Sequence, residues 1–328
     1  MTPAELSRTV VRVVRSAVDE GALVVAGDAV PEVVKVERPR PGGGGDYASG
    51  VALKLAAAAG LPPRRVAELL RQRIADQPGI ALVDITGPGF LNITLDRGAQ
   101  FDVVRRIVRG GTSYGYGDAL RGQSHAFADA SESRARVVTE VVVRLLRAQG
   151  ADARVVRHGG QPLPVVACEQ PRLAELVGRD AARWAMLRAA RHDRPRTDVA
   201  ELLAQRESSA FFRVRYAYSR SRALARNALQ LGFRAEAGAV PEGDALLGLL
   251  GDHPGVLESA ARHRAPDRLA RQLEAVADEL LCFQHGVLPL GDEKPSAAHR
   301  SRLALAEAAG TVLAGGLSLL GVDAPEFV

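Results

Sequence analysis

The stretch FFRVRYAYSRSRALARNA, residues 211–228, reads as one long helix in which arginines are interleaved with tyrosines. Arg213, Tyr216 and Arg220 fall at positions i, i+3 and i+7, so they share one face of that helix. An adjoining face carries Arg215, Ser219, Arg222 and Arg226. Arginines can bind phosphates, and tyrosines can stack on the unpaired bases of an RNA loop. The alternative is a solvated arginine face with Tyr216 and Tyr218 half-buried at its border, and the pattern alone leaves both readings open.

The pattern around this helix predicts an α+β fold that is predominantly α. From about residue 172 onward the sequence is helical throughout, which suggests a helical bundle over 172–328. Residues 1–110 predict a small α+β domain, in which two strands flank the turn signal Gly-Pro-Gly at 87–89. Between them, 111–171 contains a glycine-rich linker and a short helix–strand segment. His-Pro-Gly at 253–255 is expected to form a loop, with His253 at the surface.

The glycine-rich run PGGGGDYASGVAL, residues 41–53, does not match a nucleotide-binding loop. Gly45 and Gly50 have the spacing of a P-loop, but Val51 and Ala52 stand where that motif needs Lys and Ser or Thr. The spacing also fails the dinucleotide fingerprint, and two prolines, Pro39 and Pro41, precede the glycines. A flexible connector is therefore the favoured interpretation of the residues alone.

Composition and charge limit the classes of function. The 43 Lys and Arg residues include only three lysines, so 40 are arginines, which bind phosphate through planar paired donors. The net charge of +5 fits a polyanion without requiring one. Because the apolar stretch near TVLAGGLSLLGV is short and rich in glycine, we expect no membrane insertion, no export and a cytoplasmic protein.

No constellation of residues indicates catalysis. The histidines show no metal-ligand spacing, and the two cysteines, Cys168 and Cys282, lie far apart without a C-x-x-C partner. A G-x-S-x-G nucleophile motif is also lacking in the sequence. We therefore expect no catalytic residues, no metal site and no cofactor.

Several stretches together resemble the arginyl-tRNA synthetase family of class I enzymes. GDYAS at 45–49 and GPGFLNITL at 87–95 resemble the family's additional N-terminal domain, and SYGYGD at 113–118 resembles the linker that follows it. ELVGRDAARWAMLRAARHD and the helix at 211–228 resemble the passage into its DALR-type anticodon-binding domain. The resemblance implies an N-terminal additional domain at 1–110, a linker and remnant of the catalytic Rossmann unit at 111–171, and an anticodon-binding bundle at 172–328. On this interpretation the chain is a truncated paralogue.

The catalytic signatures of that family are not found in the 328 residues. The family binds ATP with a His-x-Gly-His element before a helix, and a mobile Lys-Met-Ser-Lys loop neutralises pyrophosphate. HAFADASESRA, at 125–135, stands where the first would be, and QPLPVVACEQPRL, at 161–173, bridges the place of the second. Because adenylation depends on positioning and charge stabilisation, we expect no aminoacylation.

The resemblance also assigns residues that contact tRNA. It implies anticodon-binding roles for Arg213, Tyr216, Arg220, Gln284, His285 and Val328. For the outer corner of the tRNA it implies Phe90, Asn92 and Arg97. Some positions depart from the family: Arg213 replaces an aromatic residue, Gln284 and His285 replace a Tyr-Asn pair, and Val328 replaces a Met. These departures affect specificity for the arginine anticodon more than binding to RNA as such.

Our leading hypothesis is a non-catalytic protein that binds tRNA through its two end domains. One alternative is an interaction subunit that pairs with a protein partner, such as a full-length synthetase, and no longer binds RNA. Another is arginine–tRNA ligase activity that is completed in trans.

Overall fold

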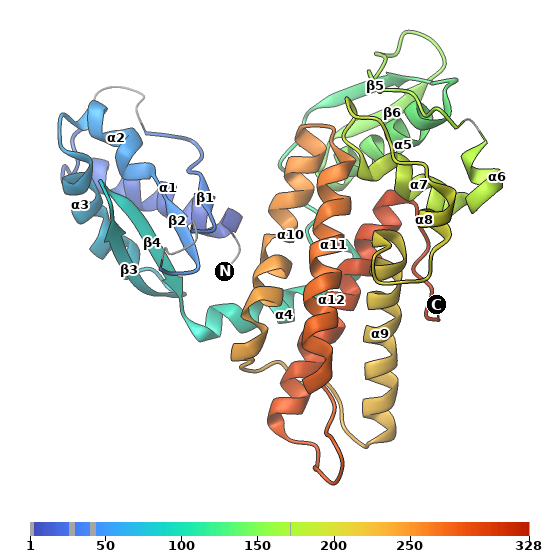
Figure 1. Cartoon of the computed structure of the whole chain (residues 1–328). Coiled ribbons are helices and arrows are strands. Elements are labelled where there is room, and N and C mark those ends of the chain that lie inside the picture. Colours follow the sequence, from blue (N-terminus) through green and yellow to red (C-terminus); the bar gives the residue numbers. More distant parts are fainter. Residues whose placement is uncertain (1–2, 26–29, 40–43, 171, 328) are drawn as a thin grey trace. The chain divides into compact units, whose positions relative to one another are not determined.

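The computed structural model describes residues 3–25, 30–39, 44–170 and 172–327 of the chain. Its internal contacts divide the chain into unit 1, Met1–Val103, and unit 2, Val104–Val328. Each unit buries its own apolar side chains. The expected α+β class with a predominance of helix is confirmed (Figure 1).

Unit 1 combines an antiparallel sheet with helices that pack on it. Its elements are α1 (Pro3–Asp19), β1 (Val36–Glu37), β2 (Tyr47–Ser49), α2 (Val51–Ala59), α3 (Pro63–Ala75), β3 (Ile80–Thr86) and β4 (Phe90–Leu95). The strands follow the order β1-β2-β4-β3. Val10 and Val14 of α1, Leu70 of α3 and Ile93 of β4 all belong to one buried cluster.

The Gly-Pro-Gly signal forms the predicted hairpin between β3 and β4. Thr86 pairs with Phe90 across the turn, and Gly89 has φ 143°, in the region that favours glycine. A Cβ on Gly89 would lie 2.8 Å from the carbonyl oxygen of Pro63. The turn is therefore seated against the first residue of α3, and no larger side chain fits at position 89.

The GDYAS stretch builds the sheet. Tyr47 and Ser49 are buried on β2, which pairs with β1 and with β4. Asp46 accepts a hydrogen bond from the Leu95 N–H at 2.8 Å, and the Ser49 hydroxyl donates to the carbonyl of Lys35 at 3.2 Å. These polar side chains satisfy backbone groups of their own unit, which is a structural role.

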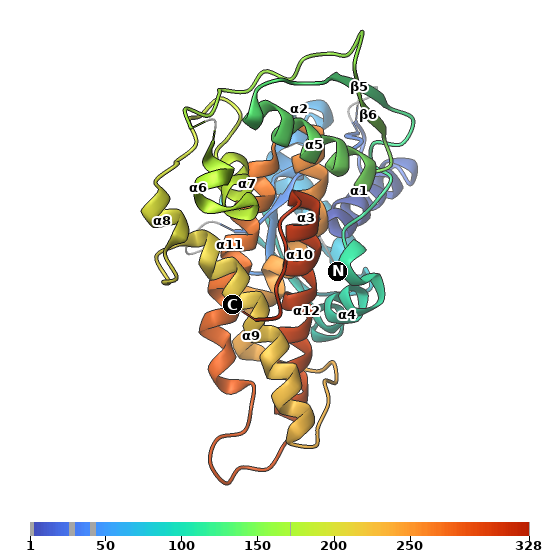
Figure 2. The same cartoon turned by 90° about the vertical axis from the view of Figure 1, so that its right-hand side faces the viewer.

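Unit 2 is mainly a bundle of long helices. Helix α4 (Arg97–Gly110) begins in unit 1, ends in unit 2 and leads into η1 (Gly111–Ser113). The later helices are α6 (Leu173–Val177), α7 (Arg179–Arg188), α8 (Val199–Leu203), α9 (Ala210–Gln230), α10 (Asp244–Arg262), α11 (Pro266–Phe283) and α12 (Ala297–Leu320), with the short turns η2 (Pro241–Gly243) and η3 (Gln284–Gly286). Helix α11 contacts α9, α10 and α12 (Figures 1 and 2).

A strand–helix–strand segment covers one end of this bundle. It consists of β5 (Ser124–Ala128), α5 (Ser133–Ala148) and β6 (Asp152–Val156), and the two strands pair in parallel. Helix α5 packs against α7, α10, α11 and α12 (Figure 2). The sequence had predicted only the helix and the second strand, because SHAFA at 124–128 carries no long apolar run.

Arg134, near the start of α5, is completely buried, and its guanidinium donates five hydrogen bonds to backbone carbonyls. Its Nε donates to the carbonyl of Met186 at 3.0 Å. Its two terminal nitrogens donate to the carbonyls of Val166, Asp193, Ala189 and Ala190 at 2.6–3.0 Å. One side chain thus joins α5 to the loops on both sides of α6 and α7.

The loop predicted at His-Pro-Gly, 253–255, is wrong. Helix α10 continues through Pro254, and His253 is only 2% exposed, so the expected surface position of this histidine is also wrong. The His253 ring stacks on the Tyr114 ring with centroids 5.9 Å apart, and its Nδ1 donates to Gln272 Oε1 at 2.8 Å. Packing against these two residues outweighs the local cost of a proline within a helix.

Helix α12 is long and apolar enough to cross a membrane by length and composition, with a mean hydropathy of 1.7. The sequence-based expectation that this region is too short was wrong, because the helix begins at Ala297. However, 78% of its most apolar window is buried inside the protein, where α12 contacts α9 and α11. Its apolar character is that of a helix at the centre of a bundle.

Candidate nucleic-acid interface

Helix α9 presents the residues singled out in the sequence because its opposite face is anchored in the bundle. Ser209 caps its first turn by accepting a hydrogen bond from the Phe212 N–H at 3.4 Å. The buried residues recur every three or four positions: Phe211, Val214, Ala217, Ser221, Leu224 and Ala228. This spacing turns the arginines and tyrosines away from the core.

Arg220 and Gln284, which are far apart in the sequence, meet on the surface of unit 2. The Arg220 Nε donates to Gln284 Oε1 at 2.8 Å, and the Gln284 amide donates to the carbonyl of Leu281 at 3.1 Å. The glutamine therefore fixes one edge of the guanidinium, and within the described residues its terminal nitrogens form no hydrogen bond. His285 is the next residue of the same short turn, and it is exposed.

Tyr216 lies one turn before Arg220 and is half-buried, as is Tyr218. The Tyr216 ring stacks on Phe212 with centroids 5.5 Å apart and an interplanar angle of 11°. A ring supported on one side by another ring is held in place for a planar group on its other side. Tyr216, Arg220, Gln284 and His285 form what we call the α9 face.

Arg213 is held by more contacts than Arg220, which lies on the same face of α9. Its Nε forms an ion pair with Asp278, and its Nη1 donates to the carbonyl of Glu207 at 2.5 Å. Arg213 thus links α9 to α11 and to the loop before α9. Val328, the remaining residue assigned to the anticodon region, lies outside the described residues.

In unit 1, Phe90 and Asn92 differ in accessibility. Phe90 begins β4 beside the Gly-Pro-Gly turn, and its side chain is 42% exposed. Asn92 is only 4% exposed, and its amide donates to the Thr86 hydroxyl at 2.8 Å, so it braces the turn and presents little to a partner. Arg97 is the first residue of α4, and its side chain lies outside the described part.

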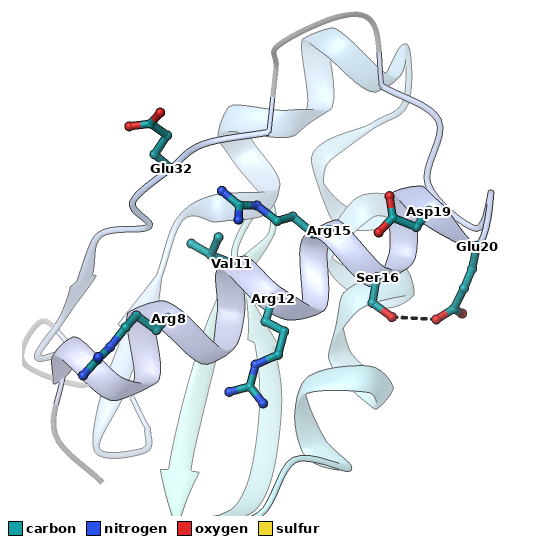
Figure 3. A pocket seen from close by; sticks show the side chains of 8 residues that line it. All are labelled: Arg8, Val11, Arg12, Arg15, Ser16, Asp19, Glu20 and Glu32. Atoms are coloured by element: carbon teal, nitrogen blue, oxygen red, sulfur yellow. Dashed lines mark hydrogen bonds between the residues drawn. The ribbon is translucent and has the colours of Figure 1, made fainter.

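A second group of arginines lies along α1 and was not identified as a candidate site from the sequence. Arg8, Arg12 and Arg15 line a shallow cavity of about 480 Å³ together with Asp19, Glu20 and Glu32. Figure 3 shows the arginines on successive turns and the two carboxylates Asp19 and Glu20 at the end of the helix. Glu20 accepts hydrogen bonds from Ser16 and Arg73, which lower its pKa, so this carboxylate is already engaged. The i, i+4, i+7 spacing was the signal that could have revealed a basic row.

The start of α5 is occupied by a carboxylate from its own chain. Glu132 caps the helix, accepting from the Ala135 N–H at 2.7 Å and from the Cys168 N–H at 3.1 Å. Burial raises the pKa of Glu132, but these backbone hydrogen bonds outweigh it and hold the pKa below its usual range. A helix N-terminus filled by an ionised side chain repels a phosphate.

Models of two protein families match the chain. Residues 5–95 match the arginyl tRNA synthetase N terminal domain, and residues 214–328 match the DALR anticodon binding domain. The second match contains the whole α9 face, so this face belongs to an anticodon-binding domain.

Curated relatives agree with these matches. The chain is 45% identical over 161 residues to arginine–tRNA ligase of Renibacterium salmoninarum, covering 46% of this chain and 29% of that protein. It is 40% identical over 195 residues to the Micrococcus luteus arginine–tRNA ligase, covering 55% and 35%. The chain thus spans about a third of the length of the curated relatives it matches.

The fold itself is shared with solved synthetases. The arginyl-tRNA synthetase of Thermus thermophilus superposes with a TM-score of 0.73 at 13% identity, and that of Plasmodium falciparum with 0.72 at 8% identity. Both superpositions cover 100% of this chain and 100% of the other.

Proposed function

Because the chain belongs to the arginyl-tRNA synthetase family, we propose that it is a tRNA-binding protein without aminoacylation activity of its own. The observation that carries the proposal is the α9 face, where Tyr216, Arg220 and Gln284 converge from two elements within an anticodon-binding domain. An oriented guanidinium beside a supported aromatic ring suits the phosphates and unstacked bases of an RNA loop.

The residues of this face take different roles in the proposal. Tyr216 stacks on a base of the anticodon loop, and Arg220 binds a phosphate or a base edge in the orientation that Gln284 imposes. His285 adds a donor at the border of the face. Arg213 acts through position, since its guanidinium is tied to Asp278.

The absence of catalysis is supported by the start of α5. In a synthetase active site this helix end would receive ATP, but here the Glu132 carboxylate occupies its N–H groups. The 328 residues also contain neither His-x-Gly-His nor Lys-Met-Ser-Lys. We therefore expect the purified protein to show no arginine-dependent exchange of pyrophosphate into ATP. Exchange that appears on addition of a second protein would support a ligase completed in trans.

Unit 1 is proposed to contact the outer corner of the tRNA. Phe90 is the accessible residue at the Gly-Pro-Gly turn, Asn92 holds that turn in shape, and Arg97 follows β4. The arginines of α1, which share their cavity with Asp19, Glu20 and Glu32, supply further phosphate contacts that carry no sequence information.

The test is tRNA affinity of the double variant Tyr216→Ala, Arg220→Ala, measured by filter binding with total tRNA from the source organism. Loss of one stacked base and one guanidinium contact should weaken binding by roughly 10- to 1000-fold. The matched control is Tyr116→Ala with Arg121→Ala, which removes the same residue types from exposed positions of unit 2. Equal affinities for the two double variants, with circular dichroism unchanged, would contradict the assignment of the α9 face.

A further inference from the structure

Residues 322–327, which follow α12, are fastened to the outer side of α9. The Ser219 hydroxyl donates to the carbonyl of Glu326 at 2.8 Å. Arg222 donates from Nε and Nη2 to the Glu326 carboxylate at 3.3 and 3.2 Å, and Arg226 Nη1 lies 3.7 Å from its other oxygen. Three side chains on successive turns of α9 therefore hold one residue of this segment.

The residue that this arrangement presents is Phe327. Its side chain is 73% exposed, and the guanidinium carbon of Arg226 lies 4.6 Å from the centroid of its ring. The guanidinium covers one face of the ring by a cation–π contact, while most of the remaining surface meets solvent. A large apolar side chain is thus displayed in a fixed position at the surface.

A single exposed phenylalanine needs no explanation by itself, because apolar side chains are common on protein surfaces. Here the neighbouring residue is bound by Ser219, Arg222 and Arg226, and the ring itself rests on a charged group. Ordering a chain segment costs roughly 1–2 kcal/mol per residue in conformational entropy, and these contacts act against that cost. Ser219 follows Tyr216 by three positions, so the segment is held next to the row that carries Tyr216 and Arg220.

The chemistry of the ring selects a planar partner. A phenyl ring backed by a guanidinium and open on its other side offers the stacking surface that single-stranded nucleic acid uses, whichever base is present. The cations beside the ring, Arg222 and Arg226, are paired with Glu326, so stacking rather than attraction to phosphate is the interaction that this position offers.

We propose that Phe327 is a stacking platform for one unpaired base of an RNA loop, held in position by Glu326. This inference rests on the proposed function, since the loop is that of the tRNA bound at the α9 face. Glu326 is a positioning residue: its carboxylate also neutralises Arg222 and Arg226, which directs affinity toward stacking and away from sequence-blind attraction to phosphate.

The experiment uses the full chain with Phe327 replaced by Trp. The chain contains one tryptophan, Trp184, which is 2% exposed and packs near Phe211, so the added emission reports on position 327. The probes are an RNA hairpin whose loop carries the anticodon sequence retained from total tRNA, and a blunt duplex of the same stem. We expect the hairpin to quench the added emission and the duplex to leave it unchanged.

A second variant, Phe327→Leu, keeps an apolar side chain but removes the ring. Its affinity for the hairpin should fall roughly 5- to 100-fold, and Phe327→Tyr should restore it. Because the side chain is exposed, the melting temperature of both variants should equal that of the wild type, which makes misfolding an inadequate explanation.

The outcomes separate the two proposals. If the wild-type protein retains no tRNA, the proposed function fails and this inference fails with it. If the wild type binds, but Phe327→Leu binds equally and the Trp emission is not quenched, the stacking platform is refuted while the proposed function stands. Loss of a protein partner from Phe327→Leu with RNA binding intact would likewise overturn the platform and assign the ring to a protein interface.

Discussion

Individual buried polar residues decide how unit 2 holds together, and Arg134 is the strongest case. An arginine offers five N–H donors in a rigid plane, and here each nitrogen finds at least one backbone carbonyl. Burial lowers the pKa of Arg134, and the nearby carboxylates of Glu132 and Asp193 oppose that shift. A lysine could not replace this geometry, because an ammonium is a point charge with three donors.

The burial of His253 predicts that the stability of the protein depends on pH. Burial lowers its pKa to about 4, against the opposing hydrogen bond to Gln272, so the folded protein keeps this side chain neutral. The unfolded chain takes up the proton near pH 6.5. The contribution of His253 is therefore complete above about pH 6.5 and falls as the pH drops toward 4. Lowering the pH from 6.5 to 5 should therefore reduce the free energy of unfolding by roughly 2 kcal/mol.

The measurement is urea unfolding at these two pH values for the wild type and for His253→Asn, whose amide can still donate to Gln272. The variant should lose less stability than the wild type on acidification. His263→Asn, at an exposed position, is the control and should follow the wild type. Parallel pH dependence in all three proteins would show that His253 does not titrate in this way.

At the level of helices, replacing either of two glycines by alanine should change the free energy of unfolding, and the two changes should have opposite signs. Gly316 of α12 lies against Leu273 of α11, and an added Cβ would approach that side chain to 2.5 Å. Gly255 of α10 has nothing within 4 Å of such an atom. We expect Gly316→Ala to lower the free energy of unfolding by about 1–3 kcal/mol through overpacking. Gly255→Ala should raise it by about 0.5–1 kcal/mol through helix propensity.

Denaturant unfolding of both variants provides the comparison, and each serves as the other's control because the chemical change is the same. A stabilised Gly316→Ala would mean that α11 and α12 can separate without cost, contrary to the close contact described here.

Local signals in the sequence predicted some elements well. Gly-Pro-Gly predicted the hairpin of β3 and β4, because its residues act through their own backbone conformation. Strands β2 and β5 were missed, since they are short and exist through pairing with β4 and β6. His-Pro-Gly is a local loop signal, but here tertiary packing stabilises a continuous helix α10 across it.

In the candidate site, too, some features could be predicted from local sequence and others could not. The alignment of Tyr216 with Arg220 follows from helical periodicity and could be predicted. The bond from Arg220 to Gln284 joins residues 64 positions apart, which no local pattern indicates. Neither the burial of Asn92 nor the attachment of Glu326 to α9 could be inferred, because both depend on which chain segment lies opposite.

At the scale of the whole molecule, the two units should contribute to RNA binding in distinguishable ways. Removing Arg12 and Arg15 of α1 should weaken binding to all tRNAs equally. It should also reduce the slope of log affinity against log salt by roughly 1 to 2, because each phosphate contact releases counterions. Tyr216→Ala should weaken binding with the slope nearly unchanged.

Filter binding at several salt concentrations measures both effects. Arg65→Ala with Arg71→Ala, on exposed positions of α3, removes the same charge elsewhere in unit 1 and is the control. If the α1 and α3 variants change the slope equally, then α1 is an ordinary solvated face and not a part of the interface.

The carbonyls gathered around Arg134 also bear on which segments of unit 2 can be removed without loss of stability. Point changes can erase the adenylation chemistry while leaving the backbone intact. Excision of residues 124–156 would instead remove Arg134 and orphan the carbonyls of Val166, Met186, Ala189, Ala190 and Asp193 in one step. Each acceptor that stays buried and unpaired costs about 1–3 kcal/mol, so unit 2 depends on this segment for its stability whether or not any reaction takes place there.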